Sequence, residues 1–139
     1  MKLNFDKAQC FTVPEKLDLL INAELATLTT PALDTSTITF NFRDNDYSAE
    51  SGGFQPVEIR LELHNNLWQF IYITDFSYQG FPYPELVKEI DICFQSKRVY
   101  SLYGGNLSRR DGNELLKLFL SNFIEYHAMG TYQVTVSCD

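Results

Sequence analysis

The chain has 139 residues, of which 45% are hydrophobic and 21% are charged. This size and balance fit a single globular domain, and they exclude a disordered chain, a fibrous protein and a multidomain enzyme with a separate cofactor module. The 18 acidic residues outnumber the 11 lysines and arginines, so the net charge is −7. A surface this acidic repels phosphate groups, and we therefore expect neither nucleic acid nor an anionic membrane as a partner.

Three cysteines, Cys10, Cys93 and Cys138, lie far apart in the sequence. An odd and sparse set predicts small buried thiols in a reducing compartment rather than a disulfide framework. The N-terminus lacks the apolar core of a signal peptide, and no run approaches the roughly 20 apolar residues that span a bilayer. We therefore expect a cytoplasmic protein.

An apolar stripe predicts a helix over residues 14–28, after an N-terminal arm of residues 1–13. Pro14 suits the first helical turn, where its missing N–H costs nothing. The stripe recurs at helical spacing, with members Leu17, Leu20, Ile21, Leu25 and Leu28.

Alternation of apolar and polar residues predicts strands in the next part of the chain. They cover residues 37–42, 57–64, 67–74, 86–94 and 99–103. Asn65 and Asn66 indicate a tight turn, because asparagine tolerates positive φ. The strand from Leu67 to Thr74 is apolar on both faces, with Trp68, Phe70 and Tyr72 on one of them, so it is predicted to be central and covered twice.

A second helix and a last strand complete the prediction. Asp111 and Glu114 resemble a capping box, and Gly130 sits where a helix-ending glycine belongs. The helical stripe between them comprises Leu116, Phe119, Leu120, Phe123 and His127, and a strand follows at 132–136. The order α-β-β-β-β-β-α-β predicts one α+β domain over residues 1–139, in which an N-terminal and a C-terminal helix flank a twisted antiparallel sheet of about six strands.

Signatures of nucleophilic catalysis are weak. His64 ends a strand on its polar side, and His127 lies on a helical stripe, where a packed histidine is commoner than a general base. Neither has a local nucleophile motif, and Cys93 is typical of strand packing. We predict no catalytic residue and no cofactor, and an interaction protein is favoured over an enzyme.

A polar loop at residues 44–53 faintly resembles a calcium loop through Asp44, Asp46 and Glu50. The EF-hand pattern needs glycine at its sixth position and glutamate at its twelfth, where this chain has Ala49 and Gln55. We therefore predict no metal site, and we interpret the segment as a loop between strands.

The segment from Asp75 to Pro84 is predicted as a loop that holds more aromatic rings than a core requires. Tyrosine and phenylalanine are enriched at interfaces, where they bury much area at low entropic cost. We predict a non-enzymatic, acidic interaction module whose binding surface is loop 75–83, formed by Asp75, Phe76, Tyr78, Phe81 and Tyr83. A secondary surface beside it comprises Asp44, Asp46, Tyr47 and Glu50.

Several alternatives stay open. The rings of loop 75–83 can fold back as a lid over the sheet edge. A carboxylate at a strand end can serve a small-ligand site or an enzyme, with Asp75 acting beside Tyr78 or Tyr83 and with Glu85 as a second acid. Edge strands at 37–42 or 131–137 can pair between chains and form a homo-oligomer, since an uncovered edge invites strand addition.

Several stretches of the chain resemble domain-of-unknown-function family 2787. They are Ile38–Asp44, Tyr47–Gly53, Pro56–Ile59, Tyr72–Tyr78 and Pro84–Asp91. The family consists of short acidic proteins of Vibrio, Shewanella and relatives, often carried on genomic islands, and the resemblance covers about residues 30–137. It implies a fold similar to the acidic mitochondrial-glycoprotein (complement-binding) family, whose members form oligomers and bind several partners. No catalytic residue comes with it, and a likeness of fold is weak ground for function.

Overall fold

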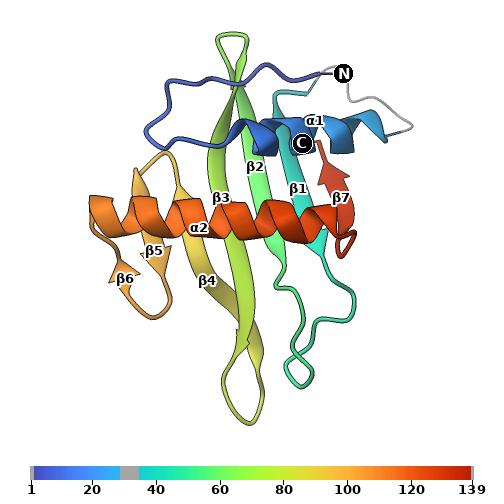
Figure 1. Cartoon of the computed structure of the whole chain (residues 1–139), viewed down its shortest axis with the longest axis vertical. Coiled ribbons are helices and arrows are strands. Elements are labelled where there is room, and N and C mark those ends of the chain that lie inside the picture. Colours follow the sequence, from blue (N-terminus) through green and yellow to red (C-terminus); the bar gives the residue numbers. More distant parts are fainter. Residues whose placement is uncertain (1, 29–34, 139) are drawn as a thin grey trace.

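One antiparallel sheet and two helices make up the protein, a computed structural model that describes residues 2–28 and 35–138. The sheet order is β6-β5-β4-β3-β2-β1-β7. The strands are β1 (Thr37–Arg43), β2 (Val57–His64), β3 (Leu67–Gln79), β4 (Glu85–Cys93), β5 (Arg98–Ser101), β6 (Gly105–Asn106) and β7 (Gln133–Ser137). Helices α1 (Glu15–Ala26) and α2 (Arg109–Ala128) lie on one face of the sheet (Figure 1). The predicted α+β class is confirmed, with the short β6 as a seventh strand.

The helix ends differ in detail from the prediction. Pro14 is the N-cap of α1 rather than a residue of its first turn. The N-cap of α2 is Ser108, whose hydroxyl accepts a hydrogen bond from the backbone N–H of Asp111 at 3.2 Å. Asp111 therefore lies in the first turn, where its carboxylate is favourable beside the unpaired N–H groups. Gly130, with φ of 76°, follows the helix as predicted.

β3 is the central strand, as expected, but a β-bulge changes which of its side chains face the helices. Arg60 pairs with Tyr72 and Leu61 pairs with Phe70, so Ile71 is an extra residue between them. The extra residue reverses the alternation, because successive side chains of a strand point to opposite faces. Phe70 joins the helix-covered core, whereas Tyr72 turns to the other face. The prediction that Tyr72 shares a face with Phe70 is therefore wrong.

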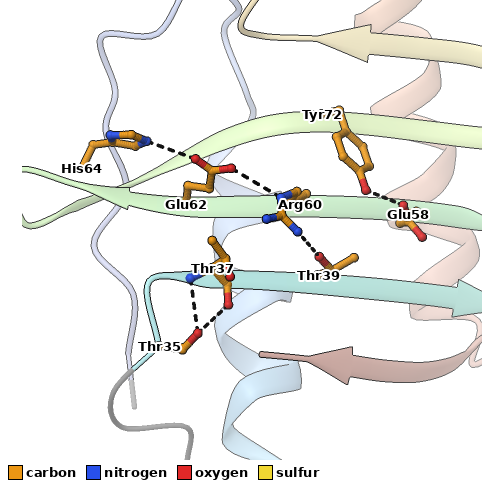
Figure 2. Close-up of polar contacts among 8 residues, drawn as sticks. All are labelled: Thr35, Thr37, Thr39, Glu58, Arg60, Glu62, His64 and Tyr72. Atoms are coloured by element: carbon orange, nitrogen blue, oxygen red, sulfur yellow. Dashed lines mark hydrogen bonds and ion pairs between the residues drawn. The ribbon is translucent and has the colours of Figure 1, made fainter. Parts of the chain in front are cut away.

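The second face of the sheet is polar, and no helix of the described residues covers it. Figure 2 shows its side chains on the side of the strands away from α1 and α2. Arg60 donates to the Thr39 hydroxyl at 3.2 Å and pairs with Glu62 at 3.4 Å. The Tyr72 hydroxyl donates to Glu58 at 2.5 Å. The prediction of a strand covered on both sides is wrong, because charges on this face pair with one another in contact with water.

The edges of the sheet are β6 and β7. β1 pairs with β2 on one side and with β7 on the other, so the prediction that residues 37–42 form an edge is wrong. The segment after α2 returns to the sheet and occupies that edge. The predicted strand near the C-terminus, β7, is therefore an edge strand of the sheet.

The N-terminal arm crosses the end of the sheet near the β2–β3 turn (Figure 1). Phe5 forms a parallel bridge with Trp68, and the Gln9 side chain both donates to and accepts from the backbone of Phe70, at 2.9 and 2.8 Å. Lys7 forms an ion pair with the buried Asp18 of α1. These contacts attach the arm to the domain.

The prediction that the cysteines are buried is wrong. Cys10 and Cys138 are exposed, and Cys93 is half-buried on the polar face. Among the described residues, no helix is both long enough and apolar enough to cross a membrane.

Candidate functional site

The predicted loop 75–83 is mostly strand. β3 continues to Gln79 and pairs with β4 through Phe76 opposite Lys88 and Tyr78 opposite Leu86. Only residues 80–84 form the turn, in which Gly80 has φ of 102°. The loop prediction is wrong over residues 75–79 because the partner strand, which the local sequence does not reveal, satisfies their backbone hydrogen bonds.

The β3–β4 hairpin projects beyond the end of the sheet (Figure 1). Phe81 and Tyr83 at its turn are 97% and 86% exposed. We use the name aromatic tip for the rings of Tyr47, Tyr78, Phe81, Tyr83 and Tyr103, of which Tyr47 is half-buried and the others are exposed. The Tyr47 and Tyr78 rings stack with centroids 5.4 Å apart, and Gln79 donates to the Tyr103 hydroxyl at 3.2 Å. These contacts hold segments distant in sequence against the hairpin.

The loop at residues 44–53 lies beside the hairpin, through Tyr47. Asp44 organises this loop, because its carboxylate accepts from the backbone N–H groups of Asp46 at 3.0 Å and Phe54 at 3.1 Å. A Cβ at Gly53, where φ is 123°, would lie 3.0 Å from that carboxylate. Asp44 therefore has a turn-forming role, while Asp46 and Glu50 are exposed.

Asp75 points away from the aromatic tip into a cavity beneath α2. The cavity has a volume of about 360 Å³, and Asp75 is only 5% exposed. Its apolar wall includes Val57, Ile90, Leu115, Phe119 and Phe123. Its polar groups are those of Gln55, Asp75, Asn122, Tyr126 and Tyr132. Within the described residues, neither Tyr78 nor Tyr83 belongs to the lining. The five predicted site residues therefore do not form one site, because Asp75 lies at the cavity, Phe76 is half-buried opposite Lys88, and the other three belong to the aromatic tip.

The Asp75 carboxylate has neutral hydrogen-bond donors. One oxygen accepts from the backbone N–H of Ile90 at 2.8 Å. In the amide orientation that satisfies both acids, Gln55 donates to the other Asp75 oxygen at 2.8 Å and to Glu89 at 3.0 Å. Burial raises the pKa of Asp75 to about 7; the Ile90 hydrogen bond opposes this rise, and the charge of Glu89 adds to it. A carboxyl group with this pKa exchanges protons near neutral pH.

The second acid beside Asp75 is Glu89 rather than Glu85. Glu85 is exposed at the start of β4, opposite Gln79. Glu89 is brought to Gln55 by a bulge in β4, since Asp75 pairs with Ile90 and the next residue of β3 pairs with Lys88. Sequence reasoning missed Gln55, Glu89, Tyr126 and Tyr132, which come from four separate segments with no shared motif.

The two histidines have structural surroundings. The His127 Nε2 lies 2.6 Å from Glu24 and links α2 to α1, while its ring meets the edge of Phe42 at 6.0 Å between centroids. This confirms the interpretation of His127 as a packed histidine with a polar partner. His64 lies at the end of β2, with its Nε2 3.4 Å from Glu62.

A second hollow, of about 840 Å³, separates the N-terminal arm from α2. Its lining includes the basic pair Arg109 and Arg110, together with Lys16 and Glu114. Arg110 and Glu114 form an exposed ion pair at 3.8 Å. Such pairs add little stability, and their placement is that of a solvated helix start.

Two solved structures of hypothetical proteins are similar to this chain in sequence and in fold. A hypothetical protein from the VSP-II pathogenicity island of Vibrio cholerae is 36% identical, with a TM-score of 0.90, over 99% of this chain and 100% of that one. A conserved hypothetical protein from pathogenicity island VPI-2 of Vibrio cholerae O1 biovar eltor is 32% identical, with a TM-score of 0.81, over 94% and 98% of the two chains. That protein is described as sharing structural homology with the human P32 protein. No curated protein matches the sequence.

The sequence also matches a family model over most of its length. A model described as a protein of unknown function, DUF2787, matches residues 15–137, which include both helices and every strand of the sheet. The two Vibrio structures agree in fold over almost the whole chain. The chain therefore belongs to the DUF2787 family.

Proposed function

We propose that this chain is a protein-interaction module that binds a partner protein through the aromatic tip. The observation that carries the proposal is the exposure of Phe81 and Tyr83 on a turn that projects beyond the sheet. Apolar surface in water is unfavourable by about 25 cal/mol per Å². Contact with a partner would remove part of this exposed area, and aromatic side chains commonly supply much of the binding free energy of an interface.

Contacts among Tyr47, Tyr78, Gln79 and Tyr103 hold the base of the aromatic tip before binding. Tyr47 stacks on Tyr78, and the Tyr47 hydroxyl accepts from the Tyr78 backbone N–H at 3.2 Å. Gln79 joins the hairpin to Tyr103. A surface that is already ordered loses less conformational freedom when it binds, so more of the contact energy appears as affinity.

Charges around the aromatic tip indicate the chemistry of the partner. Asp46, Glu50 and Glu85 are exposed acids in two of the segments that form it. A partner that presents an apolar side chain flanked by arginine or lysine would match these charges. Arginine also stacks on tyrosine and phenylalanine rings, which favours it over lysine here.

The test is site-specific photo-crosslinking in host cells. A benzophenone amino acid replaces Phe81 in one variant and Leu19, an exposed residue of α1, in the control. We expect one dominant adduct with another protein from position 81, absent from position 19 and lost when Tyr83→Ala is added. Identical adducts from both positions, or none from position 81, would contradict the proposal. An adduct with the mass of two copies would replace it with self-association.

A second candidate function, binding of a small ligand at Asp75, has a separate observation in its favour. The cavity beneath α2 has the volume of a small-molecule site and contains one buried carboxyl group. The groups placed to act with Asp75 are Gln55, Tyr126 and Tyr132 rather than Tyr78 and Tyr83. Ligand screening by NMR against wild type and Leu115→Trp, which fills the cavity, tests this candidate. Hits that survive the substitution would contradict it.

A further inference from the structure

The electrostatics of the cavity beneath α2 favour a cation. Asp75 faces into it, and Gln55 connects Asp75 to the second carboxylate, Glu89. Burial raises the pKa of the Tyr132 phenol, and the negative charges of Asp75 and Asp44 raise it further. Among the described residues, the lining includes no lysine, arginine or histidine. A negative potential in surroundings of low dielectric attracts a positive group and repels an anion.

The rings around the cavity suit an ammonium group with an apolar body. Phe54 lies 4.7 Å from Tyr126, and Phe123 lies 5.6 Å from Tyr132, between ring centroids. The faces of such rings attract cations, most strongly where water is excluded. The volume of about 360 Å³ is at the small end of the range for ligand pockets, about 300–1,000 Å³. It therefore limits the ligand to a small molecule.

We propose that the cavity binds a small organic ammonium compound, with its charged nitrogen at Asp75 and its apolar body against Leu115, Phe119 and Phe123. The proposal rests on the second candidate function and specifies its ligand class. An anion would meet the Asp75 carboxyl group, with Glu89 beyond Gln55, and no lysine, arginine or histidine of the described lining would compensate. A neutral ligand would leave the buried Asp75 without an opposite charge, whereas an ammonium group supplies one.

The protonation of Asp75 gives this proposal a pH signature. The groups that share its electrostatic surroundings are Glu89 on β4, Tyr126 on α2, Tyr132 before β7 and Asp44 in the loop. The pKa of Asp75 is raised to about 7, so at lower pH its carboxyl group holds a proton, which an ammonium ligand must displace. Affinity therefore rises with pH. Between pH 6 and pH 8 we expect about a tenfold gain, because the ionised fraction rises from about a tenth to about nine tenths.

Three probes of similar shape separate the ligand classes. They are 2-phenylethylamine, which is cationic, 2-phenylethanol, which is neutral, and 3-phenylpropionate, which is anionic. Binding to the wild-type chain is measured by NMR titration at pH 6 and pH 8. We expect the amine to bind at least tenfold more tightly than the alcohol at pH 8, and the anion not to bind. If the alcohol binds as tightly as the amine, the ammonium proposal fails while the small-ligand site stands. If no probe binds, both fail.

Variants locate the binding. Asp75→Asn should weaken binding of the amine at least tenfold, the scale of a lost charged hydrogen bond, and should abolish its pH dependence. Asp91→Asn is the matched control, because Asp91 lies on the neighbouring strand with its hydrogen bond to Thr74 on the open face. Equal losses in both variants would show a non-specific attraction to an acidic protein and overturn the proposal.

A measurement on the wild-type chain locates the bound probe even if a variant fails to fold. Nuclear Overhauser contacts between 2-phenylethylamine and the rings of Phe119 and Tyr132 are expected at saturating probe concentrations. Contacts only with residues outside the cavity would contradict the site.

Discussion

Two carboxylates on neighbouring strands, Asp75 and Asp91, show how differently the two faces of the sheet treat a charge. Asp91 lies on the open face, accepts from the Thr74 hydroxyl at 2.6 Å and lies 3.8 Å from Lys88. Asp75 lies on the helix-covered face, has neutral donors and is 5% exposed. Thr74 pairs with Asp91, and the next pair along the same two strands is Asp75 with Ile90. One step along the strands therefore leads from an acid paired on the open face to an acid buried under the helices.

Charged side chains on the open face are compatible with a stable fold, whereas the buried carboxyl group of Asp75 is not explained by stability. A sheet face in contact with water accommodates charges at little cost, and pairing them there contributes little. A buried carboxyl group without a counter-charge lowers the stability of the fold, so its presence calls for another reason. Asp75 therefore marks the cavity as the part of the core to examine for binding.

The largest expected effect on the free energy of unfolding comes from comparing two neighbouring residues of β1 that lie on opposite faces of the sheet. Phe42 is fully buried and meets Phe123 edge-to-face at 4.9 Å between centroids, whereas Asn41 alternates with it on the open face. Phe42→Ala should lower the free energy of unfolding by about 3–5 kcal/mol, and Asn41→Ala should change it by less than about 0.5 kcal/mol. Urea unfolding of both variants measures the difference. Similar losses would mean that the open face is covered in solution.

The next effect comes from the raised pKa of Asp75. Its carboxyl group ionises near pH 4 in the unfolded chain and near pH 7 in the folded one. Between these values the folded state binds more protons, so this group makes the fold less stable as pH rises from 4 to 7. The loss is about 1.4 kcal/mol for each unit between the two pKa values.

Asp75→Asn removes this dependence. Relative to wild type, the variant should gain stability steadily from pH 4 to pH 7 and hold that gain at pH 8. The difference in urea midpoints between the two proteins isolates Asp75, because the other titrating groups are common to both. Asp91→Asn again serves as the control. Parallel stability curves for wild type and Asp75→Asn would show that Asp75 is not held in a desolvated site.

A smaller effect is expected on the open face. Tyr72→Phe removes the hydroxyl that donates to Glu58, and should cost about 0.5–1.5 kcal/mol. Burial, with the hydrogen bond to Glu58, raises the pKa of Tyr72 to about 12, so the hydroxyl stays protonated and the cost should be constant from pH 6 to pH 9. A double-mutant cycle with Glu58→Gln measures the coupling. An uncoupled pair would mean that water replaces the bond at no cost.

The smallest expected effect on stability is at the aromatic tip. Phe81 is almost fully exposed, so Phe81→Ala should change the free energy of unfolding by less than about 0.5 kcal/mol. Tyr47→Ala, which removes the stack on Tyr78, is expected to cost more. A large loss from Phe81→Ala would show that the ring packs in solution, and would argue against a free binding surface.

Much of the fold follows from local patterns. The stripe from Leu17 to Leu25 predicts α1, and alternation along residues 57–64 predicts β2, because periods of 3.6 and 2 reflect the geometry of a single element. The Asn65 and Asn66 turn also follows, since both residues adopt positive φ. The sequence pattern predicts the N-cap of α2 at Asp111, whereas the N-cap is Ser108, three residues earlier. The pattern does not distinguish them, because serine and aspartate are both good N-caps.

The sequence by itself determined the α+β class, the antiparallel hairpins and the concentration of aromatic residues near β3. Only the tertiary structure decided which face each side chain occupies and what lies beside it. The bulges near Ile71 and Glu89 reverse side-chain directions through pairing with other strands. Asp75 acquires its cavity only when α2 and Gln55 close over it. Periodicity is a property of one segment, whereas burial and pKa depend on segments that meet only in the folded chain.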